Sequence, residues 1–366
     1  MAGRSQLNPL TARKLRRFRE IRRGYYSFLL LVGLVGVSLV GELLVNNKAI
    51  LVRYEGEWSF PTYTRVRLGE EFGLIGEARQ VPVDYRALAE RFEDEDGGNF
   101  VVLPFIPYNA YENDPYEDVF KPAPPSAASR HFLGTDSTGR DILARLLFGF
   151  RTAILFAVAF MALTYLIGIT LGCLMGFFGG LFDLFLQRLI EIWSNIPFLY
   201  MVIIVFSVIP TSFDVRTRIG ILLTIMVLFS WTSMTYYMRT ATYREKERDY
   251  TAAAMVLGAS TPRIIFGHII PNVVSTIVTF VPITVSNAII AVTALDFLGW
   301  GLPPPTPSMG ELLKQGTANL TTAPWIVSSA FVTLVLILTL VNFVGEAVRE
   351  AFDPKKFTVY QLELKP

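Results

Sequence analysis

The sequence has 366 residues, of which 52% are hydrophobic and 17% are charged, and its mean hydropathy is +0.43. Soluble domains usually carry about 25% charged residues, and here the charges gather in a few segments, so the composition excludes an ordinary soluble domain and is typical of a chain in lipid. The net charge of +2 is informative only through its distribution, and a single cysteine excludes an intrachain disulfide or a cysteine-based metal cluster.

Residues 1–24 form a strongly basic segment, with eight arginines and lysines against Glu20. An apolar run follows over 25–45, interrupted near its end by Glu42. The run is long for the apolar region of a signal peptide, and no A-x-A cleavage site follows it. We therefore predict a retained first transmembrane helix over 25–45.

Five further stretches without a charged residue follow, and each is long enough to cross about 30 Å of hydrocarbon. They are Thr152–Phe182, Ile192–Phe213, Ile219–Met238, Ile269–Leu295 and Gln315–Gly345. Because a backbone in lipid must form its hydrogen bonds within its own segment, the spans are predicted to be helices. The expected fold is an all-α integral membrane protein with six transmembrane helices, five of them in a core over 152–348.

The basic residues predict the orientation, since cytoplasmic loops carry an excess of lysine and arginine. The cationic segment 1–24 is expected in the cytoplasm, and counting crossings then fixes every loop. The loops assigned to the outside are 46–151, 214–218 and 296–314, and those assigned to the inside are 183–191, 239–268 and the tail 349–366. Five basic residues in 239–268 agree with this assignment, whereas Arg216 and Arg218 disagree mildly.

The external segment 46–151 is predicted to be a small insertion of mixed or irregular structure. Between Arg53 and Arg130 it holds fifteen acidic and eight basic residues, with aromatic residues interleaved. Alternation in 51–54 indicates short strands, and the proline-rich 121–125 is typical of a linker. No catalytic constellation is visible there.

Small residues and prolines mark places where helices approach or bend. Four glycines recur every four residues on one helix face, where a missing side chain lets another helix approach closely: Gly168, Gly172, Gly176 and Gly180. That face either packs statically or slides against a partner. Pro197 and Pro282 each remove a backbone hydrogen bond, which predicts either a pathway border or a plain kink. Cys173, within an apolar stretch, is expected to pack, and the isolated His131 and His268 are expected to make structural or polar contacts.

The segment 239–275, called the coupling loop below, is the most informative. A charged lead-in ends at Asp249, and 250–257 is rich in small, helix-forming residues. Gly258 is expected to end that helix, and Thr261-Pro262 to start a second one. A short apolar helix exposed to water requires a groove to fill, although an ordinary interfacial loop remains the alternative.

The coupling loop resembles the EAA loop of binding-protein-dependent ABC importer permeases. The positions that match its pattern are Ala253, Ala254, Gly258, Ile270 and Pro271. Ala252 stands where the family has glutamate, and His268 where it has isoleucine. Docking is therefore expected to rest on shape and apolar contact at Ala253, Ala254 and Leu257, without an ion pair from position 252.

Three further segments resemble the C-type permease of dipeptide and oligopeptide importers. They are 131–145, with Gly134, Thr135, Asp136, Gly139, Arg140 and Asp141; 176–183; and 295–313, with Asp296 and Gly299. Segment 44–63 and the motif Leu-Asp-Phe-Leu-Gly at 295–299 are most similar to the microcin C-type peptide permease. The resemblance covers 131–353.

The resemblance implies a fold of the type I ABC importer kind in a bacterial inner membrane, with both termini cytoplasmic. It implies that Ala252, Ala253, Ala254, Leu257, Gly258 and Pro271 belong to an ATPase-coupling element, that the 134–141 motif lies near the pathway mouth, and that Pro197, Asp296 and Gly299 are candidates for a pathway or gate. The sequence has no phosphate-binding P-loop, so no cofactor is expected on this chain, and ATP and magnesium would be bound by a separate ABC ATPase. The other implied partners are a second, homologous permease in a heterodimer, an extracytoplasmic peptide-binding protein and membrane lipid, with no nucleic acid. The acidic 53–130 region would contact the binding protein or shield the pathway mouth, or be only a solvated cap.

Other function classes fit less well. A secondary transporter usually keeps ionisable residues in mid-membrane, and the five later stretches have none. A membrane enzyme could use Asp136 and Asp141 as paired carboxylates, but Thr135 and Asp136 are also good N-cap residues and are expected to orient a helix start. A structural or receptor role without transport has no specific support. We therefore expect a transport subunit and no enzyme.

Overall fold

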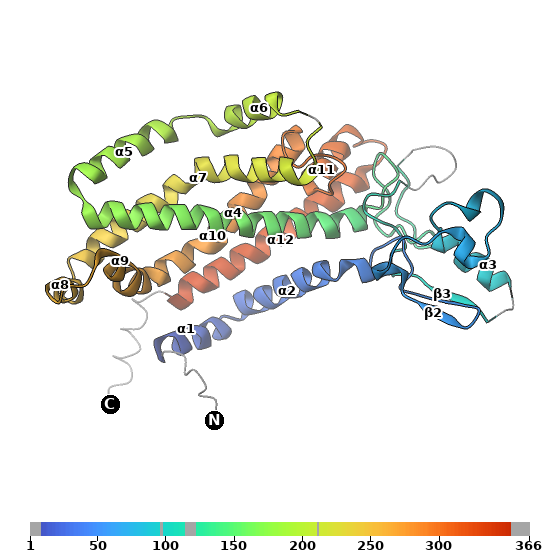
Figure 1. Cartoon of the computed structure of the whole chain (residues 1–366), viewed down its shortest axis with the longest axis horizontal. Coiled ribbons are helices and arrows are strands. Elements are labelled where there is room, and N and C mark those ends of the chain that lie inside the picture. Colours follow the sequence, from blue (N-terminus) through green and yellow to red (C-terminus); the bar gives the residue numbers. More distant parts are fainter. Residues whose placement is uncertain (1–8, 96–97, 114–121, 211, 353–366) are drawn as a thin grey trace. The chain divides into compact units, whose positions relative to one another are not determined.

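The computed structural model describes residues 9–95, 98–113, 122–210 and 212–352 (Figure 1). Arg4, part of the proline-rich 121–125 and nearly all of the predicted tail 349–366 therefore lie outside the described residues. The chain divides into two compact units. Unit 1 comprises Met1–Val32, Ile154–Val292 and Leu336–Pro366, and unit 2 comprises Gly33–Ala153 and Thr293–Val335.

Four helical segments are long and apolar enough to cross a membrane: α4 (Ile142–Phe178), α7 (Val215–Lys246), the segment Thr261–Leu298 and α12 (Pro324–Phe352). A fifth crossing exists if α5 (Gly180–Ser194) and α6 (Phe198–Val208), which meet at a 72° bend, form one broken span. The described residues thus contain four or five candidate spans, and the prediction of six is not established by them.

The first predicted span is helical over different residues. Helix α1 (Pro9–Glu20) is followed by α2 (Arg22–Leu39), and a 3-10 turn covers Gly41–Leu43. The α-helix therefore includes Arg22 and Arg23 and ends six residues before the predicted boundary at 45. The charged start and early end explain why α2 is not among the clear candidate spans.

The predicted inside turn over 183–191 is wrong, because these residues lie within α5. The chain instead breaks at Gly179 and Gly180, whose φ values of 65° and 56° are left-handed and cannot continue a helix. Pro197 is likewise not inside a helix. It precedes α6 at the bend, where no helical hydrogen bond requires its backbone N–H.

The last predicted stretch, 315–345, also divides differently. Its start belongs to α11 (Met309–Ala318), which Ser308 caps by accepting the Glu311 N–H at 3.2 Å. The long helix α12 begins only at Pro324, a residue suited to a first helical turn. The predicted loop 296–314 therefore contains the start of a helix.

Glycines bring α4 and α7 together in unit 1. A Cβ on Gly172 would lie 2.5 Å from the Thr235 carbonyl oxygen, and one on Gly176 would lie 2.6 Å from that of Arg239. Gly168 approaches Met234 as closely, and Cys173 is buried in the same contact, as predicted. Gly180 does not take part, because it lies beyond the break with open space around its Cα.

Unit 2 contains the mixed structure predicted for part of 46–151. A three-stranded antiparallel sheet has the order β2 (Glu57–Ser59), β1 (Leu51–Tyr54), β3 (Phe100–Val102), and α3 (Tyr85–Asp94) packs beside it (Figure 1). The predicted strand at 51–54 is confirmed. Its core is small and largely aromatic: Val52, Phe72, Tyr85, Leu88 and Phe92.

The α4–α7 contact generates a stability prediction. Gly172→Ala should lower the free energy of unfolding by about 1–3 kcal/mol, because the added methyl group would overlap the α7 backbone. Thermal unfolding in detergent measures the effect. Gly36→Ala is the matched control, since α2 leaves open space at Gly36. Equal unfolding midpoints for the two variants would contradict the close contact.

Candidate functional site

The coupling loop has the predicted helix–turn–helix form. Helix α8 (Asp249–Val256) ends at Gly258, which has a φ of 76°. The Gly258 N–H donates to the Met255 oxygen and the Ala259 N–H to the Ala254 oxygen, each at 3.0 Å. This pair of bonds is the Schellman motif, which satisfies the last carbonyls of a helix.

The second half of the coupling loop is not a separate short helix. Helix α9 (Thr261–Ile264), with Pro262 in its first turn, passes through a π-helical turn (Ile265–Ile269) directly into α10 (Ile270–Leu298). Pro271 explains the π turn, because a proline cannot donate to the carbonyl one helical turn earlier and its ring displaces that carbonyl. The residues Thr261–Leu298 therefore form one continuous helical segment.

Two hydrogen bonds to Glu245 hold α8 against the end of α7. The Thr251 hydroxyl donates to the Glu245 backbone oxygen at 2.7 Å, and the Tyr250 hydroxyl donates to the Glu245 carboxylate at 2.6 Å. Lys246 donates to the Phe177 carbonyl oxygen at 2.5 Å. The loop is thus a fixed extension of the helices around it.

The exposed surface of α8 differs from the predicted one. Val256 and Leu257 are 87% and 85% exposed, and Ala252 and Ala253 are also exposed. Ala254 is only 8% exposed and packs with Ile264 and Ile269. Ala254 therefore belongs to the core of the loop, and its predicted part in docking is wrong. Sequence reasoning missed Val256, although its place beside Leu257 in an apolar run was a usable signal.

An ion pair between buried Asp183 and half-buried Arg239 fixes the start of α5 in unit 1. Arg239 donates to both oxygens of Asp183, at 2.5 and 2.6 Å, and the Tyr243 hydroxyl donates to the same carboxylate at 2.6 Å. The bidentate geometry joins α5 to α7 directly after the Gly179 break. The sequence signal was Asp183 itself, an acidic residue directly after a long stretch without charge, and no role was predicted for it.

In unit 2, four charges form what is called below the Asp136 network: Asp136, Arg140, Arg145 and Glu311. The Arg140 side chain donates to Asp136 at 2.8 Å and to Glu311 at 2.9 Å. Arg145, fully buried, donates to Glu311 and, at 2.9 Å, to the Ala110 carbonyl oxygen. Two cations and two anions balance, which is the condition for burying charge without a large penalty. The network joins the 134–141 motif to α11.

The prediction that Thr135 and Asp136 cap a helix is wrong. Asp141 caps α4, accepting the Ala144 N–H at 2.7 Å, and also contacts His131 Nδ1 at 2.8 Å. The Asp136 carboxylate instead closes a turn by accepting the Thr138 and Arg140 N–H groups. Thr135 accepts from the Ala123 N–H through its hydroxyl. The expected polar contact of His131 is confirmed.

Left-handed glycines explain the spacing of this motif. Gly134 and Gly139 have φ values of 77° and 80°. A Cβ on Gly134 would also lie 2.8 Å from Nε1 of Trp325, which donates to the Thr135 carbonyl oxygen. A side chain at Gly134 would therefore displace that contact between the motif and α12.

Asp296 and Gly299 close the end of α10. Gly299 has a φ of 85°, and the Trp300 and Gly299 N–H groups donate to the Leu295 and Asp296 carbonyl oxygens in a second Schellman motif. The Asp296 carboxylate accepts the Leu302 N–H and the Ser308 hydroxyl, each at 2.5 Å. The observed arrangement is a helix end clamped to α11.

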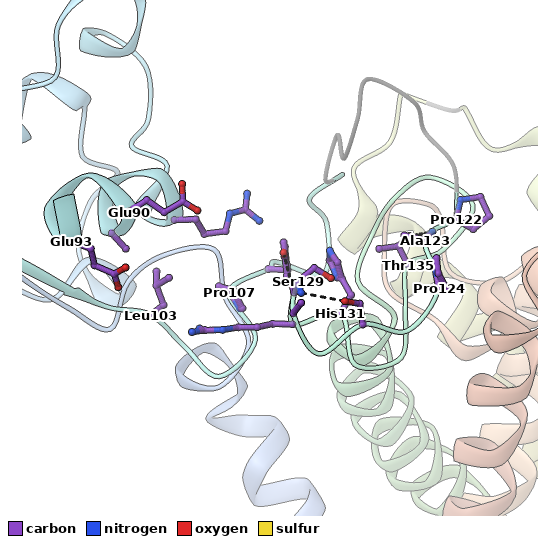
Figure 2. A pocket seen from close by; sticks show the side chains of 16 residues that line it. Glu90, Glu93, Leu103, Pro107, Pro122, Ala123, Pro124, Ser129, His131 and Thr135 are labelled. Carbon is purple, nitrogen blue, oxygen red and sulfur yellow. Dashed lines mark hydrogen bonds between the residues drawn. The ribbon is translucent and has the colours of Figure 1, made fainter.

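A cavity of about 790 Å³ in unit 2 lies between α3 and the loop before α4 (Figure 2). Glu90 and Glu93 line it from α3, and Ser129, His131 and Thr135 from the loop. The His131 ring is held by Asp141 and stacks on Tyr108 with 3.9 Å between ring centres. No group of three or more potential metal ligands exists among the described residues.

These features combine apolar candidate spans, a rigid helix–turn–helix between α7 and α10 and an exposed apolar tip. Residues 168–358 match the model of a family described as "Binding-protein-dependent transport system inner membrane component". The chain belongs to this family. It is a permease subunit of an ABC importer.

Curated relatives cover most of the permease. It is 39% identical to the inner membrane ABC transporter permease protein YejE of Escherichia coli, over 96% of this chain and 99% of the relative. It is 37% identical to the peptidoglycan transport system permease protein YejE of Agrobacterium fabrum, over 95% and 94%. The oligopeptide transport system permease protein OppC of Mycobacterium tuberculosis H37Rv is 32% identical, over 70% and 84%. The similarity to peptide-importer permeases is thereby confirmed, whereas the microcin C subgroup stays a prediction.

The Asp136 network of the permease generates a second stability prediction. Glu311→Gln should lower the free energy of unfolding by roughly 3 kcal/mol, because it removes one of the two carboxylates that balance buried Arg145 and Arg140. Chemical denaturation in detergent measures the loss. Glu95→Gln is the control, because the Glu95 pair with Arg91 is exposed. An equal effect of both variants would show that the network contributes no more than a surface pair.

A pH dependence follows from the same network. Burial raises the pKa of Asp136, but Arg140 and Arg145 outweigh burial and hold that pKa below its usual value. Ionised Asp136 therefore stabilises the fold above its unfolded pKa of about 3.9, and the stabilisation is lost as the pH falls through the lower folded pKa. Asp136→Asn should be destabilising at neutral pH, with a difference that shrinks in strong acid. Unfolding midpoints across pH measure it, and a difference that does not change with pH would contradict this.

Proposed function

We propose that this permease translocates peptides or peptide-like compounds across a bacterial inner membrane, powered by ATP hydrolysed on a separate subunit. The observation that carries the proposal is the coupling loop, whose exposed apolar tip is rigidly joined to α10. The peptide class is supported by relatives named for oligopeptide and dipeptide transport. One relative is named for peptidoglycan transport, so "peptide-like" is the appropriate breadth.

In the proposed mechanism, α8 seats in a cleft of an ABC ATPase. Val256 and Leu257 fill the cleft, and Ala252 and Ala253 allow close approach because they are small. Since Ala254 packs on Ile264 and Ile269, α8 and the start of α10 move together. Closure of the ATPase on ATP favours one position of α8, and this difference in affinity shifts the helix bundle between inward-facing and outward-facing states.

The partners follow from the same scheme. A second, homologous permease supplies the other half of the pathway, and an extracytoplasmic binding protein delivers the cargo. ATP and magnesium are bound by the ATPase, so this chain needs no cofactor. The sequence supports this division, because it has no P-loop to hold phosphates.

We further propose six crossings, with α2 as the first and the bent pair α5–α6 as one. The basic residues of α1 and of 239–268 then lie in the cytoplasm, as does the C-terminus. In this orientation the 134–141 motif and the sheet of unit 2 belong to the outer face, near the pathway mouth. Pro197, Asp296 and Gly299 are candidates for the pathway border. Contact of the acidic 53–130 region with the binding protein remains part of the proposal.

Leu257→Asp tests the coupling role with little risk to folding, because Leu257 is 85% exposed. A buried charge in the ATPase cleft should reduce co-purification with the ATPase and substrate-stimulated ATP hydrolysis at least tenfold, with unchanged membrane levels. Ile75→Asp is the matched control for co-purification with the ATPase, since Ile75 is also 85% exposed but lies in unit 2. Normal coupling by Leu257→Asp would refute the proposed role of α8.

A further inference from the structure

The basic helix α1 has a face that the transport mechanism does not use. Its twelve residues contain five basic side chains and one acidic side chain, Glu20. Hydrogen bonding continues from α1 into α2, because the Ile21 N–H donates to the Arg17 oxygen and the Tyr25 N–H to the Ile21 oxygen. The helical periodicity therefore continues from α1 into the part of α2 in unit 1, so that residues three or four positions apart lie on the same side of both helices.

One of these faces packs on the chain itself. Lys14 donates to the Ser275 hydroxyl at 2.6 Å, and its ammonium lies 4.8 Å from the centre of the Phe352 ring. Farther along, Gly24 packs so closely on Ala347 that a Cβ would overlap it. These contacts fix which side of the helix is turned outward.

The outward side changes in character along the chain. The exposed residues at helical spacing are, in order, Leu15, Arg19, Arg22, Tyr26 and Leu29–Leu30. Arginine gives way to tyrosine and then to leucine, which is the order expected where a helix passes from water through the headgroups into hydrocarbon. Tyr26, 64% exposed, marks the boundary.

The rise of the helix sets the depth of the two arginines. At 1.5 Å per residue, Arg22 lies about 6 Å and Arg19 about 10 Å before Tyr26 along the axis. A headgroup layer is about 5–8 Å thick, and a long side chain can extend farther along the surface. With α2 crossing the membrane as proposed, Arg22 lies at the depth of the headgroups and Arg19 at their aqueous edge, within the reach of a long side chain. Among the described residues, neither side chain forms an ion pair, whereas Arg16 pairs with Glu20 and Arg23 with Glu346.

We propose that Arg19 and Arg22 form a binding site for the phosphate groups of anionic phospholipids. A guanidinium group binds a phosphate through two hydrogen bonds, and a negatively charged leaflet raises the local concentration of ligand. A zwitterionic headgroup also carries a phosphate, but it has no net charge to attract the guanidinium groups to the leaflet. The site therefore selects lipid by charge, and the packed face of α1 places it beside the start of α10.

The test uses the full chain in nanodiscs that contain a photoactivatable phosphatidylglycerol or the matching phosphatidylcholine probe, with labelled residues located by mass spectrometry. We expect labelling around α1 by phosphatidylglycerol to exceed that by phosphatidylcholine about tenfold and to fall with salt. Arg19→Gln/Arg22→Gln should abolish the excess. Arg65→Gln/Arg79→Gln is the control, because it removes the same charge from side chains that are 81% and 62% exposed in unit 2.

Any one of the following results would overturn the proposal. Equal labelling by the two probes, or an excess that survives the double substitution, would show that the arginines do not select anionic lipid. Full displacement of the phosphatidylglycerol probe by inorganic phosphate would make this a site for the free ion. Loss of labelling when the chain is purified with its partner subunits would make the face a protein interface. The unfolding midpoints of both variants should match that of the unmodified chain, and a lower midpoint for the α1 variant alone would assign the arginines to folding.

Discussion

Every backbone N–H and C=O group that is withdrawn from water must find a hydrogen-bond partner, and this constraint decides which residues stand where a helix of this chain ends or breaks. At each bend or helix end, a particular residue allows the backbone to leave the helical conformation. Gly179 and Gly180 adopt left-handed conformations, Pro197 stands before a helix where no donor is needed, and Gly258 and Gly299 close Schellman motifs. The π turn before Pro271 accommodates one residue more than an α-helical turn does. The bends are therefore local properties of a few residues.

Charge is confined by the same constraint to places where it can be paired. Arg239 and Asp183 form a bidentate pair next to the Gly179 break, and the Asp136 network pairs two cations with two anions. Such groups are costly to bury singly and tolerable in balanced sets. They join segments far apart in sequence, so they fix the relative positions of elements within each unit, while apolar contacts and glycines provide the close packing.

The sequence predicted what depends on local chemistry. The apolar runs located the long helices, the glycine spacing located the face of α4 that another helix approaches, and Gly258 with Pro262 located the helix–turn–helix. Features set by distant partners were not accessible. Asp141 caps α4, whereas the Asp136 carboxylate is bound by Arg140. Arg140 also binds Glu311, which lies 171 residues away in the sequence. Ala254 turned inward because Ile264 and Ile269 face it, which a linear pattern of small residues cannot show. The turn predicted at 183–191 failed because its polar residues lie on one side of a continuous helix.

The π turn at Ile265–Ile269 also sets an angular relation. A π turn holds one residue more than an α-helical turn, so it offsets the faces on its two sides by about 100° relative to an uninterrupted α-helix. The side of α9 that packs under α8 and the side of α10 that packs on α7 are aligned through this offset. The extra residue therefore sets the rotation of the exposed tip of α8 relative to α10. Any change in residue number between Ile264 and Pro271 would therefore rotate α9 relative to α10, and it would also disturb the buried contacts of Ile265 and Ile269.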